Sequence, residues 1–140
     1  MKRADIIATR VFLLLAVLAA GPGHAQEHVE VFQLSTQHVR GTDGAAVHYV
    51  DRIERVTSAL SVGLPPSTQQ AAALAKERFA ALSSADRQDI EAGARALDLA
   101  ARYRLTQVPA IVFDQRAVVY GVPDVDAART TYRAWRARGH

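Results

Sequence analysis

Hydrophobic and polar positions alternate along short stretches near both ends of the chain. Residues 28–34 alternate in this way, which predicts a strand rather than a helix. Residues 47–50 predict a second strand, and the apolar runs 108–113 and 117–121 predict two more. Because only about three polar residues separate the last two runs, they are expected to pair as an antiparallel hairpin.

Apolar residues recur at intervals of three and four through the middle of the chain, which predicts helices. Asp51 is expected to cap the first helix, and Gly63 with the prolines after it is expected to end it. Thr68 is expected to cap the second helix, and the third is expected to begin at Ser83 or Ser84. The predicted buried stripes are Ala72, Ala75, Phe79 and Leu82 in the second helix, and Ile90, Ala94, Leu97 and Ala101 in the third.

A last helix is predicted after Asp124, whose side chain can cap it. Its apolar face would be Val125, Ala128, Tyr132 and Trp135, with Arg129, Arg133, Arg136 and Arg138 largely toward solvent. Arginines interleaved with aromatic residues can also bind nucleic acid. Since both aromatic residues fall on the apolar stripe, we expect them to pack into the core, and we expect no direct nucleic acid binding.

The first 25 residues have the pattern of an export signal. A basic start precedes an unbroken apolar run at 11–20, and Gly23 and Ala25 place small residues where a signal peptidase reads them. The run is too short to span a bilayer, which needs ~20 residues. We expect cleavage after Ala25, leaving one periplasmic domain, residues 26–140, without stable membrane insertion; an uncleaved anchor is the alternative. Cleavage lowers the formal net charge of +3 by two, so charge does not favour a nucleic-acid partner.

Candidate chemistry along the chain is sparse. There is no cysteine, which excludes disulfides, thiol chemistry and sulfur-bound zinc. His28, His38 and His48 lack the close spacing of a ligand pair, so neither a metal nor a cofactor is expected.

Catalysis by a serine is the alternative left open. Ser35 and His38, together with Asp51 or Asp114, could form the catalytic triad of a small periplasmic hydrolase. A metal-dependent enzyme that uses Ser35 and His38 belongs to the same alternative. No strained Gly-x-Ser-x-Gly turn is present, and a loop serine is more often a turn or cap residue. We therefore expect a protein that is not an enzyme.

The order of the predicted elements indicates an α/β fold. A strand, then helices, then another strand favour a right-handed crossover with parallel pairing. This order together with the segment LTQVPA at 105–110 resembles the thioredoxin fold, in which a cis proline opens the third core strand. That proline faces the turn after the first strand, where Cys-x-x-Cys normally lies and where this chain has Ser35, Thr36, Gln37 and His38. The resemblance implies a thioredoxin-like sandwich: a central mixed sheet of about four strands, with an enlarged helical insertion between the second and third strands.

A closer similarity extends over nearly the whole mature chain. The shared segments are VEVF at 29–32, SALS at 58–61 before GLP at 63–65, VPAIVFD at 108–114, and VVYG at 118–121 ahead of Asp124 and Val125. In these segments the chain is similar to a family of exported thioredoxin-like proteins encoded by integrating conjugative elements. The resemblance implies a periplasmic protein associated with the type IV secretion apparatus of DNA transfer, and its partners would be other proteins of that apparatus.

The proline suggests where a partner would bind. An X-Pro bond needs only about 0.5–1 kcal/mol to be cis, so a fold can fix that form. The backbone of Val108 would then face outward at the start of the strand and could pair with an extended peptide. The candidate partner-binding residues are Ser35, Thr36, Gln37, His38, Val108 and Pro109. The alternative is that Pro109 begins an edge strand in trans.

Overall fold

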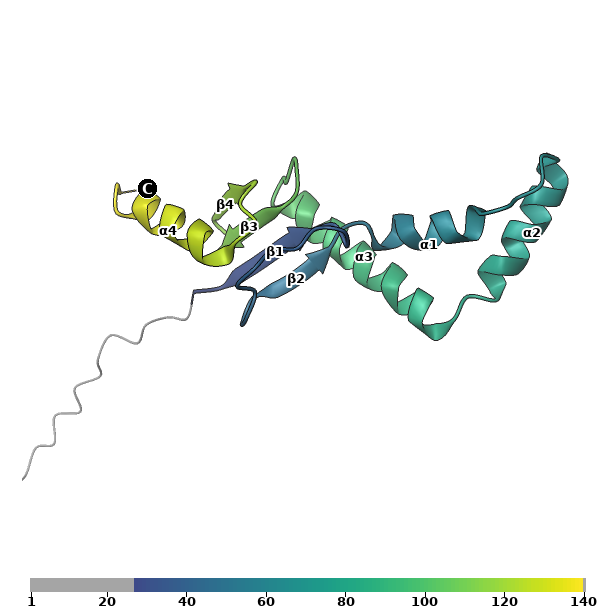
Figure 1. The fold of residues 1–140 in the computed structure, drawn as a ribbon, viewed down its shortest axis with the longest axis horizontal. Coiled ribbons are helices and arrows are strands. Elements are labelled where there is room, and N and C mark those ends of the chain that lie inside the picture. The colour runs from purple at the N-terminus through teal and green to yellow at the C-terminus, as the bar shows by residue number, and fades with distance from the viewer. Residues whose placement is uncertain (1–26, 140) are drawn as a thin grey trace, which may run out of the picture.

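The computed structural model describes residues 27–139, so the predicted export signal lies outside the described residues (Figure 1). The chain forms a mixed α/β fold with four strands and four helices in this range. In chain order the elements are β1 (Val29–Gln33), β2 (Ala46–Tyr49), α1 (Arg52–Ser61), α2 (Thr68–Ala80), α3 (Ser84–Arg102), β3 (Ala110–Phe113), β4 (Ala117–Tyr120) and α4 (Val125–Arg136). Within residues 27–139, no helix is long and apolar enough to cross a membrane.

The four strands form one mixed sheet in the order β2-β1-β3-β4. β1 is parallel to β2 and antiparallel to β3, and β3 and β4 form the expected antiparallel hairpin. The predicted crossover is wrong in one respect. The helical stretch leads from β2 to a strand of opposite direction, whereas the parallel pair β1 and β2 is joined by the loop at 34–45. That loop runs past the start of α4, where Arg40 and Asp124 form an isolated bridge.

Helices cover both faces of the sheet. On one face, Val31, Ile111 and Phe113 pack against α4 through its buried residues, which confirms most of the predicted apolar face of that helix. On the other face, Phe32 and Val112 pack against the C-terminal part of α3. Because β1 and β3 are central and covered on both sides, every residue of both strands is buried.

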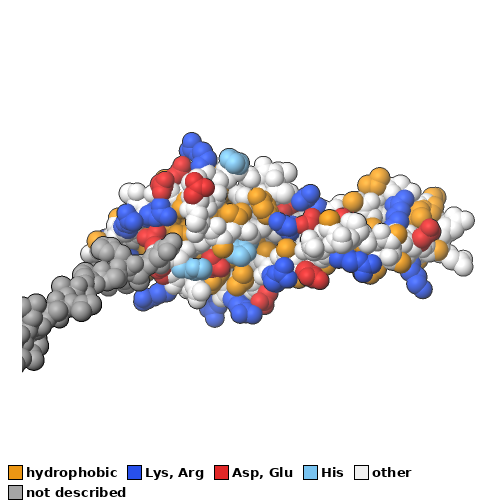
Figure 2. All heavy atoms as spheres, turned by 90° about the horizontal axis from the view of Figure 1, so that it is seen from below, with side chains coloured by type: hydrophobic (Ala, Val, Ile, Leu, Met, Phe, Trp, Pro, Cys, Tyr) orange, Lys and Arg blue, Asp and Glu red, His pale blue; other side chains and the backbone are white. Residues whose placement is uncertain are grey.

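Helices α1 and α2 and the first part of α3 form an arm that extends away from the sheet (Figure 1). The predicted stripe of α2 is wrong, since this helix has no buried residue and Phe79 is 61% exposed. In α3 the buried residues are Gly93 and Ala96. Three residues of its predicted stripe are instead exposed: Ala94, Leu97 and Ala101. Val62 is exposed as well. Figure 2 shows hydrophobic side chains on the surface at the far end of the arm.

Local signals set the helix ends. Ser83 caps α3 in a capping box with Asp86, and the carboxylate of Asp124 accepts hydrogen bonds from the first N–H groups of α4. Gly63 follows α1 with a φ of +65°, a conformation that glycine adopts without strain. These ends agree with the sequence signals, but the N-cap of α2 is Ser67 and not Thr68.

Candidate functional site

The two segments singled out by the sequence meet at one end of the sheet. β1 ends at Gln33 and is followed by a turn in which the N–H of Gln37 donates to the carbonyl of Leu34 at 3.0 Å. Pro109 directly precedes β3, and the Val108–Pro109 peptide bond is cis. Because β1 and β3 are antiparallel, the end of one lies beside the start of the other. We call residues 35–38 with Val108 and Pro109 the mouth.

The side chain of Gln37 joins the two sides of the mouth. Continuing the β1–β3 register by one more pair of hydrogen-bonded residues would place Leu34 opposite Val108. The side-chain amide of Gln37 occupies the space between them. Its Oε1 accepts from the N–H of Leu34 at 2.9 Å, and its Nε2 donates to the carbonyl of Val108 at 3.4 Å. The expected free carbonyl of Val108 is therefore occupied, while its N–H has no hydrogen-bond partner among residues 27–139.

Asp51 holds the turn from its other side. Both carboxylate oxygens of Asp51 accept from the N–H of Ser35 at 3.0 Å, and one also accepts from the Ser35 hydroxyl. Burial disfavours ionisation of Asp51, but the hydrogen bonds from Ser35 outweigh it, and the pKa of Asp51 is lowered. Asp51 is at the N-cap of α1 yet makes no side-chain capping bond, because its carboxylate is turned toward Ser35.

The structure does not assemble a catalytic triad from the candidate residues. The Ser35 hydroxyl donates to Asp51 and not to His38, whose side chain is exposed and has no partner in the described part of the chain. Asp114 lies at the opposite end of β1, where it accepts from the N–H of His28 at 3.0 Å and from the Tyr132 hydroxyl at 2.8 Å.

An open hollow of about 420 Å³ lies beside the mouth. Its walls come from the turn and from the first helix: Leu34, Asp51, Glu54, Arg55 and Ser58. Within the mouth, Thr36 and His38 are exposed, while Val108 and Pro109 are half-buried. The mouth therefore combines main-chain groups with adjacent space for side chains of a bound segment.

A buried carboxylate that the sequence reasoning missed lies in β1. Glu30 is 6% exposed and accepts a hydrogen bond from the Tyr103 hydroxyl of α3. The Nε2 atoms of His48 and His28 are 3.4 and 3.8 Å from its carboxylate oxygens, whereas His38 lies at the mouth. The sequence contains one indication of this buried carboxylate, because Glu30 is an acidic residue within a predicted apolar strand. Among residues 27–139, no group of three or more His, Cys, Asp or Glu side chains is arranged to hold a metal ion.

Removal of the Tyr103 hydroxyl tests this contact. Burial, the hydrogen bond to Glu30 and the charge of Glu30 raise the pKa of Tyr103 from 10.0 to about 12. The neutral phenol therefore contributes stability fully below pH 10, and this contribution is lost as the pH rises toward 12. Tyr103→Phe is expected to lower the free energy of unfolding by about 1–2 kcal/mol at neutral pH. Urea denaturation should show a shallower loss of stability above pH 10 in the variant than in the parent chain.

Tyr49→Phe is the control for this measurement, because the Tyr49 hydroxyl makes no hydrogen bond among the described residues. It is expected to leave the stability at neutral pH unchanged. Equal alkaline slopes in Tyr103→Phe and the parent chain would contradict the assigned role of the Tyr103–Glu30 contact.

Comparison with known proteins places the chain in a family. No curated protein and no solved structure is similar enough to match it. A family model described as a protein of unknown function, DUF1525, matches residues 26–138. The matched range covers the whole sheet, all four helices and both sides of the mouth. The chain therefore belongs to the DUF1525 family of proteins of unknown function.

Proposed function

We propose that this chain is a periplasmic, thioredoxin-like protein without redox chemistry, which binds other proteins as an assembly component of a conjugative DNA-transfer apparatus of the type IV secretion class. The apparatus and the compartment come from the sequence resemblance and the export pattern of residues 1–25. The binding role is supported by the geometry of the mouth.

The observation that carries the proposal is the bridging amide of Gln37. A side-chain amide has the same donor and acceptor as a peptide group, and here it accepts from Leu34 and donates to Val108. An extended segment of a partner can displace this side chain and make the same two hydrogen bonds with its own backbone. The N–H of Val108, which has no partner within residues 27–139, offers a third. In the free protein, the side chain of Gln37 thus occupies the hydrogen-bonding positions that the backbone of a partner would take.

The strand arrangement supports the thioredoxin-like part of the proposal. A central mixed sheet of four strands and a proline directly before the third strand are features that the resemblance implies. Three helices also separate β2 from β3, in keeping with the helical insertion that the resemblance implies. With no cysteine in the chain, dithiol exchange is excluded and binding remains the proposed role.

Site-specific photo-crosslinking in cells carrying the conjugative element tests the proposal. A photoreactive residue at His38 is expected to capture a protein of the transfer apparatus, identified by mass spectrometry. The same residue at Ser67, exposed at the far end of the arm, is expected to capture much less of it. Gln37→Ala is expected to raise the yield at His38 about fivefold, because about 1 kcal/mol of competing hydrogen bonding is removed.

Gln107→Ala is the matched control for Gln37→Ala. Gln107 is an exposed glutamine next to Val108 and makes no hydrogen bond among residues 27–139. Its replacement is expected to leave the yield unchanged. Equal capture from His38 and Ser67, or an unchanged yield with Gln37→Ala, would contradict a partner site at the mouth.

A further inference from the structure

A second concave surface lies on another part of the protein, between β4 and α4. This groove has a volume of about 380 Å³ and is open to solvent. Residues of β4, among them Ala117 and Val119, form one wall, and residues of α4, among them Tyr132 and Trp135, form the other. Two arginines also line the groove, Arg116 from the hairpin turn and Arg138 from the segment after α4. The groove shares none of its residues with the mouth.

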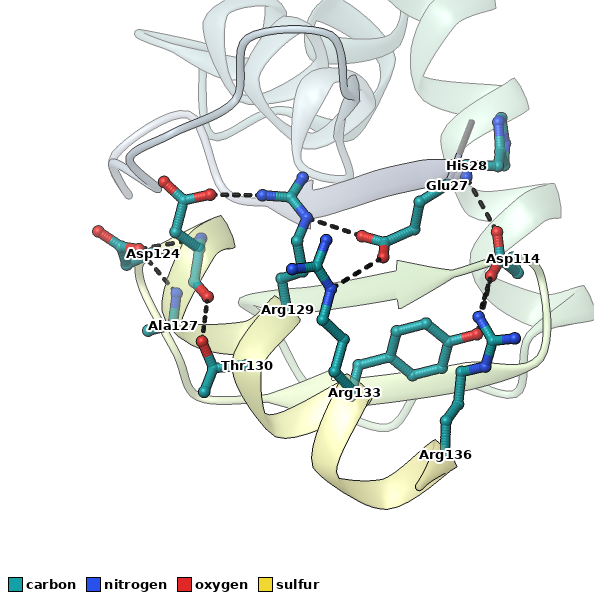
Figure 3. Close-up of polar contacts among 11 residues, drawn as sticks. Glu27, His28, Asp114, Asp124, Ala127, Arg129, Thr130, Arg133 and Arg136 are labelled. Atoms are coloured by element: carbon teal, nitrogen blue, oxygen red, sulfur yellow. Dashed lines mark hydrogen bonds and ion pairs between the residues drawn. The ribbon is translucent and has the colours of Figure 1, made fainter. Parts of the chain in front are cut away.

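The charge of the groove differs from that of the rest of α4. Three arginines of the helix already have carboxylate partners (Figure 3). Arg129 and Arg133 both approach Glu27, at 2.7 and 3.8 Å, and Arg136 lies 3.9 Å from Asp114. These ion pairs neutralise the arginines within the protein.

The two arginines of the groove have no such partner. In the range 27–139, neither the Arg116 nor the Arg138 guanidinium makes an ion pair or a hydrogen bond. None of the described residues that line the groove is acidic. Its charge is therefore purely cationic and complements carboxylates of a ligand.

The main chain of β4 adds a second requirement for the ligand. β4 is the last strand of the described sheet, so one of its edges is unpaired there. The N–H of Gly121 donates to the carbonyl of Pro109, and with the observed register this directs Val119 and Ala117 toward β3. The backbone groups of Val118 and Tyr120 consequently point away from the sheet. An extended chain that runs along this edge can pair with them.

Tyr132 and Trp135 of α4 form the apolar wall of the groove. The rings of Tyr132 and Trp135 stack with their centroids 5.9 Å apart, and Tyr132 also stacks on Phe113 of β3 at 4.8 Å. These contacts fix the orientation of the wall before any ligand arrives. A side chain from an added strand would contact a rigid apolar surface, which lowers the entropy lost on binding.

We propose that the groove between β4 and α4 binds an extended, acidic segment of another protein, which adds to β4 as a fifth strand. Its backbone pairs with Val118 and Tyr120, its apolar side chains contact Trp135, and its carboxylates pair with Arg116 and Arg138. This site goes beyond the proposed function of the mouth and does not depend on it. Nucleic acid is a weaker fit, because the other arginines of α4 are already paired with carboxylates.

Trp135 is the only tryptophan of the chain, so its fluorescence reports on the groove directly. The probes are three heptapeptides in which valine alternates with aspartate, lysine or serine. Titration of the mature chain with the aspartate peptide is expected to change the Trp135 emission, with a Kd about tenfold lower than for the serine peptide and weaker binding in high salt. The lysine peptide is expected to leave the emission unchanged.

Three variants separate the contribution of the arginine charges to peptide binding from that of the backbone hydrogen bonds to β4. The double variant Arg116→Gln, Arg138→Gln is expected to bind the aspartate and serine peptides equally, while Arg133→Gln, an exposed arginine of α4 outside the groove, retains the tenfold preference. Val118→Pro removes an outward-pointing N–H without removing a hydrogen bond to β3. It is expected to weaken the binding of the aspartate peptide and of the serine peptide by the same factor. Circular dichroism verifies that each variant is folded.

The proposal is overturned if the lysine peptide binds as tightly as the aspartate peptide, or if the double arginine variant keeps the preference for aspartate. It is also overturned if oligothymidylate or phosphatidylglycerol vesicles change the Trp135 emission and the aspartate peptide does not. Because none of the variants lies in the mouth, crosslinking from His38 is expected to be the same in all of them, and failure of one site is distinguishable from failure of the other.

Discussion

Replacing Phe113 with alanine is expected to lower the free energy of unfolding by about 3–5 kcal/mol. Phe113 is fully buried in β3, and its ring stacks on Tyr132 of α4. Truncation would leave a cavity between the sheet and α4, with little room for either to close it, because Ile111 and Val125 on both sides are also fully buried. Urea denaturation followed by far-UV circular dichroism measures the change.

Phe79→Ala is the matched control, since it makes the same substitution in the arm. Phe79 is 61% exposed in a helix with no buried residue, so its truncation is expected to change the free energy of unfolding by no more than about 0.5 kcal/mol. A cost for Phe79→Ala close to that for Phe113→Ala would show that the arm is covered in solution, and would contradict its exposed placement.

Features that depend on neighbouring residues were predictable from the sequence. The hairpin of β3 and β4 follows from two apolar runs separated by three polar residues, and α4 follows from a capping aspartate and one apolar stripe. Ser83 and Asp86 form a capping box at the spacing that the sequence displays. Each of these signals is contained within a few consecutive residues.

The arm was predicted as helices but wrongly as buried ones. A periodic apolar stripe establishes that a helix has an apolar face, but it contains no information on what covers that face. Phe79 and Leu97 were assigned to the core on their spacing, yet α2 lies beyond the sheet, and α3 turns Gly93 and Ala96 inward. Burial depends on how far the arm extends from the sheet, which is a property of the whole fold.

The candidate site was predictable only as a pair of segments. The resemblance placed residues 35–38 opposite Val108 and Pro109, and the hydrogen bond between Gln37 and Val108, 71 positions apart, agrees with that placement. The bridging role of Gln37 and the turn of Asp51 toward Ser35 depend on strand register and side-chain rotamers. Neither property leaves a periodic signal in the sequence.

Replacing Gly93 with valine is expected to lower the free energy of unfolding by about 3 kcal/mol. A Cβ atom at this position of α3 would lie 2.9 Å from Ile53 Cγ1 and 3.1 Å from the backbone nitrogen of Ile53, so α1 would have to move. The shift would act at the first turn of α1, directly after Asp51, whose carboxylate holds the Ser35 turn. Hydrogen exchange of the Ser35 amide is therefore expected to be faster in Gly93→Val, in addition to the loss of stability seen in urea.

Ala94→Val provides the control, because it adds a β-branched side chain to α3 at an exposed position one residue away. It is expected to lower the free energy of unfolding by about 0.5 kcal/mol, the helix-propensity difference between alanine and valine, and to leave exchange at Ser35 unaltered. Helix propensity alone would stabilise Gly93→Val and destabilise Ala94→Val, because valine lies between glycine and alanine on that scale. A loss in Gly93→Val no larger than that in Ala94→Val would contradict a close contact with α1. Faster exchange at Ser35 in Gly93→Val alone would connect the packing of the arm to the geometry of the mouth, because Asp51 is the residue that joins the start of α1 to the turn.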